Sequence, residues 1–276
     1  PVRVTLQVKG ELVFKDYSSP FVQKIYVYSN LARIDFCTGF LPCGRNYRLR
    51  VCFPTNVKKG NVRHEIPFGS VKRPEGEYSA WRWVDYADKE KGVCLINQGL
   101  PGNNITDGVI LLSLFRAANI KGRNDSDSGF GEGERREFRY TLRPFSQADK
   151  TYLPHREAEK INSPFLSGIV IPGRGNLSPT MSFLEVSPDN VVLSCFKKEG
   201  DALILRLYEA AGKGVKAAAI ILKSPFCLSE AKETDCLGRE IKKYSFKGNK
   251  ISFPLAPFEL KNFVLKIKTE EKGKRP

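Results

Sequence analysis

The sequence predicts an all-β protein, with a large antiparallel β-sandwich portion followed by a smaller C-terminal β-sandwich. Apolar residues recur at every second position in many short segments, as in the run Val2, Val4, Leu6 and Val8. This period of two is typical of a strand with one buried face. Gly, Pro and Asn gather between these segments, where they supply turn conformations. Together the two observations favour antiparallel strands in sandwich form.

The expected strands follow one another along the chain. After the first alternating run, the segments rich in β-branched or aromatic residues are 23–29, 33–36, 47–53, 109–115, 136–142, 191–196, 202–210, 250–255 and 262–268. Turn residues separate them at 40–46, 57–61, 73–78, 99–104, 210–214 and 246–250. Only residues 146–162 have a helix-friendly composition, and we expect Pro154 to interrupt that stretch.

A change in composition predicts the domain boundary. Residues 166–190 are rich in Gly, Pro and Ser. We expect a large β-sandwich over residues 1–168, incomplete at its N-terminus, and a terminal β-sandwich with a basic tail over residues 181–276. The only methionine is Met181 and the first residues already alternate like a strand, so we also expect a piece of a longer polypeptide.

Charge and cysteine content exclude several classes of protein. The net charge of +15 is spread over both halves of the chain without a nucleic-acid-binding motif, so we expect no nucleic-acid partner. No window is apolar enough to span a membrane. Seven cysteines without a CxxC pair make a zinc cluster improbable. We expect reduced, mostly buried thiols and a cytoplasmic protein.

Histidine content limits the catalytic chemistry. The two histidines, His64 and His155, have no histidine partner at a spacing of two to five residues. A two-histidine metal site made by folding stays an alternative to hydrogen-bonded surface or edge histidines. No hydrolase or metalloprotease motif is present. The sequence therefore predicts no catalytic residue and no metal ligand in this chain.

The segment around residues 81–88 contains candidate sugar-binding residues. Trp81 and Trp83 are expected on one face of a strand, either as a stacking platform for a sugar or as a half-buried pair in the core. Asp85 and Asp88 are either a carboxylate pair of the kind that glycosidases use or two acids in a turn. These alternatives remain open from the sequence.

A polar, glycine-containing loop follows the strand expected at residues 109–115. It contains Asp127, but its spacing fits neither an EF-hand nor a dinucleotide-binding loop. Such a loop is either a ligand contact or a solvated excursion between strands. Arg116, where the strand ends, could offer a planar group with several donors to a polar ligand, or form a salt bridge at the rim.

Several motifs together resemble a known family. The segments "LRVCFPTNVKKGNVRHEIPFGSVKRP" and "WRWVDYADKEKGVCLINQGLPGNNITDGVILLSLFRA" resemble, in order and spacing, the C-terminal β region of glycoside hydrolase family 38, the zinc-dependent retaining α-mannosidases. The segments "VVLSCFKKEGDALILRLYEAAGKG" and "GNKISFPLAPFELKNFVLKI" resemble the terminal β-sandwich of that family. The variants "WVDYAD" and "GLPGN" look more like bacterial or archaeal members.

The resemblance implies a parent enzyme that hydrolyses mannosides. In that family an N-terminal barrel holds the zinc and the aspartate nucleophile, and the β region packs against it. The implied partner of this chain is that catalytic domain or subunit, and no zinc is expected in the chain itself. Arg116 and the glycine-rich loop are similar to an arginine and a loop that reach the active-site region in Golgi-type relatives.

Three hypotheses follow. The first is the C-terminal β portion of an α-mannosidase, inactive by itself, which would contribute shape, water exclusion and a subsite contact. The second is a free-standing carbohydrate-binding β-sandwich without catalysis. The third is a basic interaction module, which would bind polyanions with a steep dependence on salt.

Overall fold

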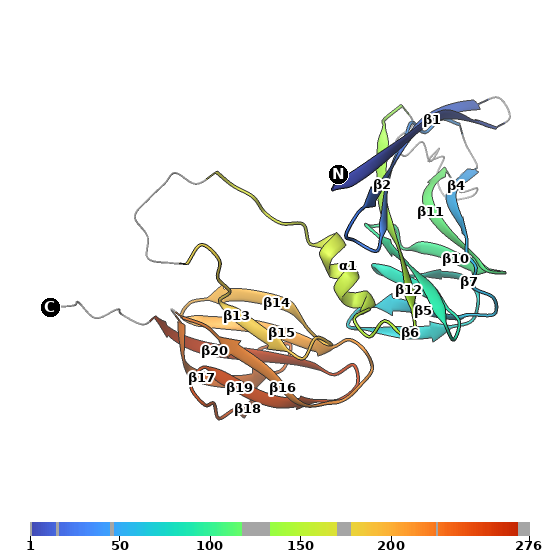
Figure 1. Ribbon diagram of the computed structural model, residues 1–276. Helices are drawn as coiled ribbons and strands as arrows, with labels where there is room; N and C mark the ends of the chain where they lie inside the picture. The colour runs from blue at the N-terminus through green and yellow to red at the C-terminus, as the bar shows by residue number, and fades with distance from the viewer. Residues whose placement is uncertain are drawn as a thin grey trace, which may run out of the picture. The chain divides into compact units, whose positions relative to one another are not determined.

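The protein is almost entirely built from antiparallel strands. The computed structural model describes residues 2–14, 17–44, 47–117, 133–169, 178–224 and 226–269. Within these residues it contains twenty strands and one helix (Figure 1). The prediction of an all-β fold is therefore confirmed. By their contacts the residues form two units, one of residues 1–66 and 71–165 and one of residues 67–70 and 166–276.

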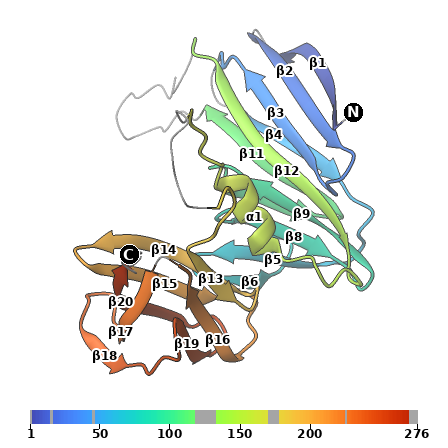
Figure 2. The ribbon, with the colours of Figure 1, turned by 60° about the vertical axis from the view of Figure 1, so that its left-hand side comes forward.

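The strands that lie wholly or mainly in the first unit form an eight-stranded sheet and a four-stranded sheet. The larger sheet has the order β1 (Arg3–Phe14), β2 (Tyr17–Tyr28), β3 (Ile34–Phe40), β12 (Arg136–Ser146), β9 (Lys91–Asn97), β8 (Trp83–Ala87), β5 (Asn61–Ile66) and β6 (Gly69–Arg73). The smaller sheet has the order β4 (Tyr47–Pro54), β11 (Val109–Ala117), β10 (Gly102–Thr106) and β7 (Gly76–Ser79). Figure 2 shows β1 and β2 at one end of the larger sheet.

The core of this sandwich lies between the two sheets. Along β11, Ile110 and Leu112 are buried while the residues between them are partly exposed. That alternation is the period of two expected of a strand with one face toward the core. Tyr140, from β12 of the larger sheet, belongs to the same apolar cluster as Ile110 and Leu112.

Helix α1 (Pro154–Asn162) covers the other face of the larger sheet. Its Ala158 packs with Trp83, Cys94 and Phe145 of the sheet in a second apolar cluster. Pro154 begins the helix, so the expectation that it interrupts one is wrong. The first helical position needs no backbone N–H and suits the fixed φ of proline.

The second unit is a smaller β-sandwich. One sheet has the order β13 (Leu184–Ser187), β16 (Val215–Leu222) and β19 (Lys250–Leu255). The other has the order β14 (Val191–Glu199), β15 (Ala202–Glu209), β20 (Leu260–Thr269), β17 (Phe226–Thr234) and β18 (Glu240–Lys243). Their inward residues, among them Leu205, Ile251 and Phe263, form the core cluster of this unit and are fully buried.

Candidate functional site

A polar pocket opens in the first unit. Its volume is about 330 Å³. Because Lys160 and Ile161 of α1 line it, the pocket lies on the helix-covered face of the larger sheet. The polar side chains that line it from the sheet and its loops are Arg3, Tyr26, Tyr28, Arg33, Asp35, Gln98, Arg139 and Thr141.

Strand register explains why these side chains meet. Asp35 of β3 pairs with Tyr26 of β2 on one side and with Thr141 of β12 on the other. Arg3 of β1 pairs with Tyr28 of β2. Residues directly opposite each other in an antiparallel ladder project to the same face, so one row of polar residues crosses four strands.

Asp35 is the centre of the hydrogen bonds in this pocket. Tyr28 Oη donates to Asp35 Oδ2 at 2.7 Å, and Thr141 Oγ1 donates to Asp35 Oδ1 at 2.7 Å. Arg33 Nε lies 3.3 Å from Asp35 Oδ1. Burial, and then the hydrogen bond to the Asp35 carboxylate, raise the pKa of the Tyr28 hydroxyl. Two hydrogen-bond donors and one ion pair thus hold the carboxylate in place.

Cationic side chains line the rest of this pocket. The Arg3 guanidinium lies 4.8 Å from the centre of the Tyr26 ring, and that of Arg33 lies 5.5 Å from the Tyr28 ring. Arg139 pairs with Glu137, and Lys160 pairs with Glu157. The pocket therefore offers several N–H donors and tyrosine rings, which suit a polar or anionic group.

The pocket lacks the groups that nucleophilic catalysis needs. Among the described lining residues there is no histidine, and Asp35 already accepts from its neighbours. Burial raises the pKa of the Cys37 thiol, which keeps it protonated at neutral pH. The arrangement can bind and orient a ligand, but it offers no activated nucleophile with a base.

Asp85, a predicted substrate-binding residue, lies inside the first unit. Its side chain is 5% exposed and its Oδ2 lies 2.6 Å from Arg63 Nη2 on the neighbouring strand. Burial raises the pKa of Asp85, while the charge of Arg63 and its hydrogen bond oppose that rise. The Arg63 side chain keeps 33% of its surface exposed, but Asp85 has almost no surface left for a sugar.

Asp85 and Asp88 do not form one carboxylate site. Asp88 Oδ1 accepts the backbone N–H groups of Glu90 at 2.8 Å and Lys91 at 2.9 Å. It closes the turn between β8 and β9, whereas Asp85 is engaged in the interior with Arg63. Of the two alternatives, the structure favours acids with separate structural roles.

The two tryptophans lie in different environments. Trp83, in β8, is 1% exposed and packs in the cluster beneath α1. Trp81 precedes β8, is 50% exposed, and has the Arg82 guanidinium 4.6 Å from its ring centre. The expectation of a pair on one strand face is therefore wrong. Trp81 alone presents an open ring face to which a sugar could bind.

Arg116 lies near the end of β11, exposed and opposite Arg48 of β4. Asp127 lies outside the described residues, so the predicted arrangement of Arg116 with the polar loop stays a prediction. Neighbouring Arg48 and Arg50 both pair with Glu77, at 2.5 and 2.7 Å. This edge of the smaller sheet is therefore rich in arginine.

Both histidines are buried rather than at the surface, which corrects the sequence-based expectation. His64 is 0% exposed, its Nε2 lies 3.1 Å from Asn103 Oδ1, and burial lowers its pKa. His155, on α1, is 4% exposed. No group of three His, Cys, Asp or Glu side chains that could hold a metal ion occurs among the residues that the structure describes.

The cysteines also differ from the expectation of mostly buried thiols. All seven are free, and only Cys37 and Cys94 are buried. Cys195 lies at a bulge of β14, where the register with β15 shifts, and it is partly exposed. The alternating apolar run around Cys195 predicted a buried side chain, but the bulge changes which side of the strand the residue occupies.

Sequence reasoning missed an ion-pair network that joins α1 to the sheet. Arg82 Nη2 lies 2.7 Å from the buried Glu65 carboxylate, and Arg82 Nη1 lies 2.6 Å from that of Glu159 on the helix. It also missed the polar row around Asp35. The only local signal was the polar residues that alternate with Ile25 and Val27 along β2.

Two family models match this chain. The model of the "Glycosyl hydrolases family 38 C-terminal domain" matches residues 1–121. The model of the "Glycosyl hydrolases family 38 C-terminal beta sandwich domain" matches residues 190–263. The second match falls within the smaller sandwich. The two matches agree with the two units found in the structure.

Curated relatives give the same picture. Alpha-mannosidase 2C1 of Mus musculus is 27% identical over an alignment of 238 residues that covers 80% of this chain and 22% of the mouse protein. Alpha-mannosidase G of Dictyostelium discoideum is 26% identical over an alignment of 257 residues that covers 87% of this chain and 23% of that protein. The chain thus spans less than a quarter of the length of these relatives.

A solved structure shares the fold. A protein in glycosyl hydrolase family 38 from Enterococcus faecalis superposes with a TM-score of 0.83 at 16% sequence identity. The match covers 96% of this chain and 35% of the bacterial one. Both units of the chain are therefore found in a larger protein of known structure.

Proposed function

This chain belongs to the C-terminal β region of glycoside hydrolase family 38, and we propose that it acts as that portion of an α-mannosidase in the hydrolysis of mannosides. The observation that supports this most directly is the pair of family models, which match both sandwiches in the expected order. The α-mannosidases of mouse and Dictyostelium add support from alignments that cover most of the chain.

In this proposal the catalytic zinc, the nucleophile and the acid–base residue come from another part of the enzyme. The pocket around Asp35 offers donors and aromatic rings but no activated nucleophile. Asp85, whose carboxylate a glycosidase could use, is buried and paired with Arg63. The contribution of this chain is then shape, exclusion of water and contacts to the catalytic domain, its proposed partner.

A cytoplasmic location and a bacterial or archaeal origin are parts of the same proposal. Seven free cysteines support a reducing compartment. The structure contains no helix, among its described residues, of the length and apolarity that a membrane crossing requires. The assignment to a bacterial or archaeal member rests on the variants "WVDYAD" and "GLPGN" alone.

The proposal is tested by measuring α-mannoside hydrolysis with the purified chain and with the complete α-mannosidase. We expect turnover only from the complete enzyme, and loss of that turnover when a chelator removes the zinc. Hydrolysis by the purified 276-residue chain that a chelator abolishes would place a catalytic centre in this chain and overturn the proposal.

A free-standing carbohydrate-binding module is the second candidate, because the Trp81 ring is half exposed. Titration with mannosides and with glucosides while recording tryptophan fluorescence separates the two functions. The first proposal expects no saturable change for the chain alone. A saturable change that Trp81→Phe removes would favour the binding module.

A further inference from the structure

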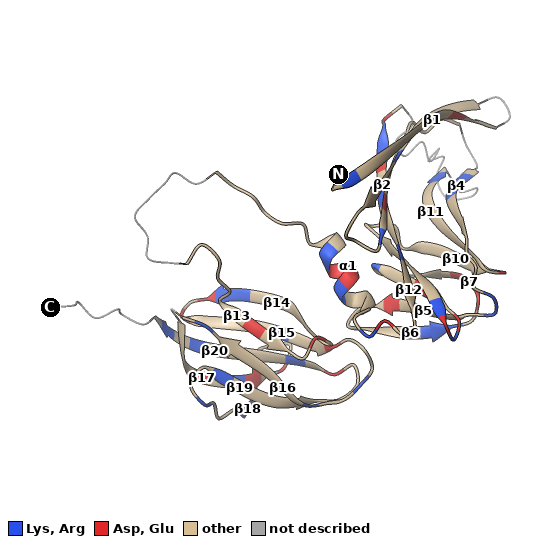
Figure 3. Cartoon of the chain, in the orientation of Figure 1, with Lys and Arg blue, Asp and Glu red and all other residues tan. Residues whose placement is uncertain are grey.

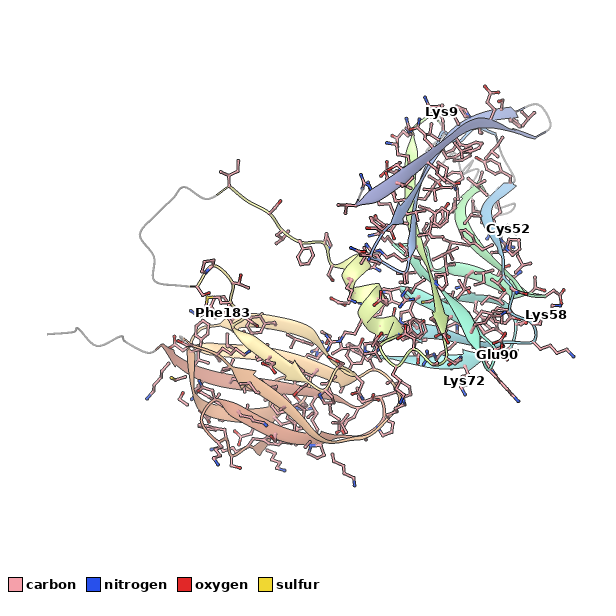
Figure 4. All side chains as sticks on the ribbon, in the orientation of Figure 1. Lys9, Cys52, Lys58, Lys72, Glu90 and Phe183 are labelled. Atoms are coloured by element: carbon pink, nitrogen blue, oxygen red, sulfur yellow. The ribbon has the colours of Figure 1, made fainter. Side chains whose placement is uncertain are left out.

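One end of the large sandwich has an uncovered apolar face. On β1, Val4, Leu6 and Val8 are 45–54% exposed, and Val2, just before the strand, is 83% exposed. Lys9, labelled in Figure 4, belongs to the opposite, polar face of the same strand. Soluble proteins rarely expose such a row on an edge strand, because it invites pairing with another strand.

This row continues the inner face of the sandwich. Leu6 of β1 pairs with Ile25 of β2, and Ile25 pairs with Phe36 of β3. Paired residues share a face, so Leu6 projects to the same side as Phe36. The Phe36 ring lies 5.3 Å from that of Phe53 on β4, across the sandwich. Apolar residues of β1 and β2 therefore lie where a core would be, and no strand of the described residues lies opposite β1.

The opposite layer ends at β4. The smaller sheet places β4 over β3, as the Phe36–Phe53 contact shows, and places β7 over β5, where the His64 and Tyr78 rings lie 5.4 Å apart. Within the described part of the chain, β4 pairs with β11 on one side and has no strand on its other side. Eight strands thus face four. Among the described strands β1 is left uncovered, and β2 is buried at Ser19, which is 0% exposed and contacts Cys43, but exposed at Val27, which is 40% exposed.

The inward residues of β4 show the same opening. Leu49, Val51 and Phe53 contact the core cluster but are only partly buried. On the next strand, β11, Ile110 and Leu112 point inward and are almost fully buried. Strand β11 has a neighbouring strand on both sides, whereas β4 has one on one side among the strands described. The greater exposure of the inward residues of β4 therefore indicates a missing neighbour.

We propose that the remainder of the α-mannosidase supplies one or two extended strands that pair with the free edge of β4 and cover the apolar face of β1 and β2. Strands lie about 4.8 Å apart, so two added strands match the width of the uncovered pair. The added segment carries apolar residues at alternate positions, which is the pattern of strand addition. This inference rests on the proposed function.

Two observations favour a covering segment from outside this chain. The chain spans only 22–23% of the two curated relatives described above, so most of their length lies beyond the aligned residues. Inside the chain, residues 118–132 follow β11 in sequence, but they are mainly polar residues and glycine without an alternating apolar run. A second copy of the chain is the competing occupant.

The test uses two double variants of β1. V4K/L6K places charges in the apolar row, and T5K/Q7K places the same charges on the opposite face of the same strand. All four positions are exposed, so both variants should fold, and circular dichroism and thermal melting check this. Each variant is mixed with the separately expressed remainder of the α-mannosidase, and both binding and α-mannoside hydrolysis are measured.

We expect V4K/L6K to weaken binding by at least tenfold, with hydrolysis falling in parallel, and T5K/Q7K to bind like the wild type. If wild-type chain binds and both variants bind equally well, the docking surface is wrong while the proposed function stands. If wild-type chain neither binds nor supports hydrolysis, both fall. A concentration-dependent dimer of the chain alone that V4K/L6K abolishes would overturn the inference in favour of self-association.

Discussion

Arg82 Nη1 lies 2.6 Å from Glu159 Oε2, and this ion pair joins the loop before β8 to helix α1. The same guanidinium contacts Glu65, whose side chain is only 3% exposed. Glu159 is 41% exposed. One arginine therefore makes one buried contact and one contact near the surface, which differ in their value for stability.

Replacing Arg82 should cost far more stability than replacing Glu159. Arg82→Ala leaves the Glu65 carboxylate buried without its cation, and we expect a loss of about 3 kcal/mol in the free energy of unfolding. Glu159→Gln removes only the half-exposed partner and should cost less than about 1 kcal/mol. Urea denaturation of the two variants measures both. Equal losses would show that Glu65 does not depend on Arg82.

Stability should depend on pH through His64. Burial lowers the pKa of His64 from its ordinary value of 6.5, so the folded state binds this proton less readily than the unfolded state. The stability is complete above about pH 6.5 and is lost as the pH falls below it, by at most about 1.4 kcal/mol per unit.

The matched variant is His64→Gln, whose side chain can still hydrogen-bond to Asn103 and does not titrate. We expect its unfolding free energy, measured in urea from pH 8 to pH 5, to fall less steeply than that of the wild type. Parallel curves would show that His64 titrates alike in the folded and unfolded states.

The two tryptophans should differ sharply in stability and in fluorescence. Trp83→Ala opens a cavity beneath α1 and should cost about 3–5 kcal/mol. Trp81→Ala loses an exposed ring and its contact with Arg82, which is worth about 1 kcal/mol or less. In Trp81→Phe the remaining Trp83 should resist quenching by iodide, whereas in Trp83→Phe the remaining Trp81 should be quenched readily.

Strands in which apolar and polar residues alternate were predictable from the sequence, because this pattern lies within a few consecutive residues. The expected strand at 109–115 corresponds to β11, and the one at 202–210 to β15. Strand β16 was not expected, because its centre is a run of alanines with weak strand preference. A strand was expected around Trp83, but every residue of β8 is buried because α1 covers its second face, so alternation could not show how its faces are covered.

The candidate site was less predictable than the fold because it depends on which strands become neighbours. Asp85 meets Arg63 only through the pairing of β5 with β8. Asp35 meets Tyr28 and Thr141 through β2 and β12, and Thr141 is separated from it by about a hundred residues. Composition shows that such side chains exist, but the long-range register decides which of them meet.

Asp35 should control the ionisation of Tyr28. Burial and the hydrogen bond to the Asp35 carboxylate raise the pKa of Tyr28. Asp35→Asn removes the negative charge and should lower that pKa, although burial still holds it above the ordinary value of 10.0. Ultraviolet difference titration measures the change, with Tyr28→Phe identifying which tyrosine is responsible.

Thr141→Val is the matched control, because it removes another donor to Asp35 but leaves the carboxylate charged. We expect the pKa of Tyr28 to change less in this variant than in Asp35→Asn, since the charge acts on the phenol directly and Thr141 acts only through Asp35. Identical titration curves for wild type and Asp35→Asn would mean that burial alone sets the pKa of Tyr28. In that case Asp35 would serve the pocket only as an acceptor for its donors, and not as the source of its electrostatic field.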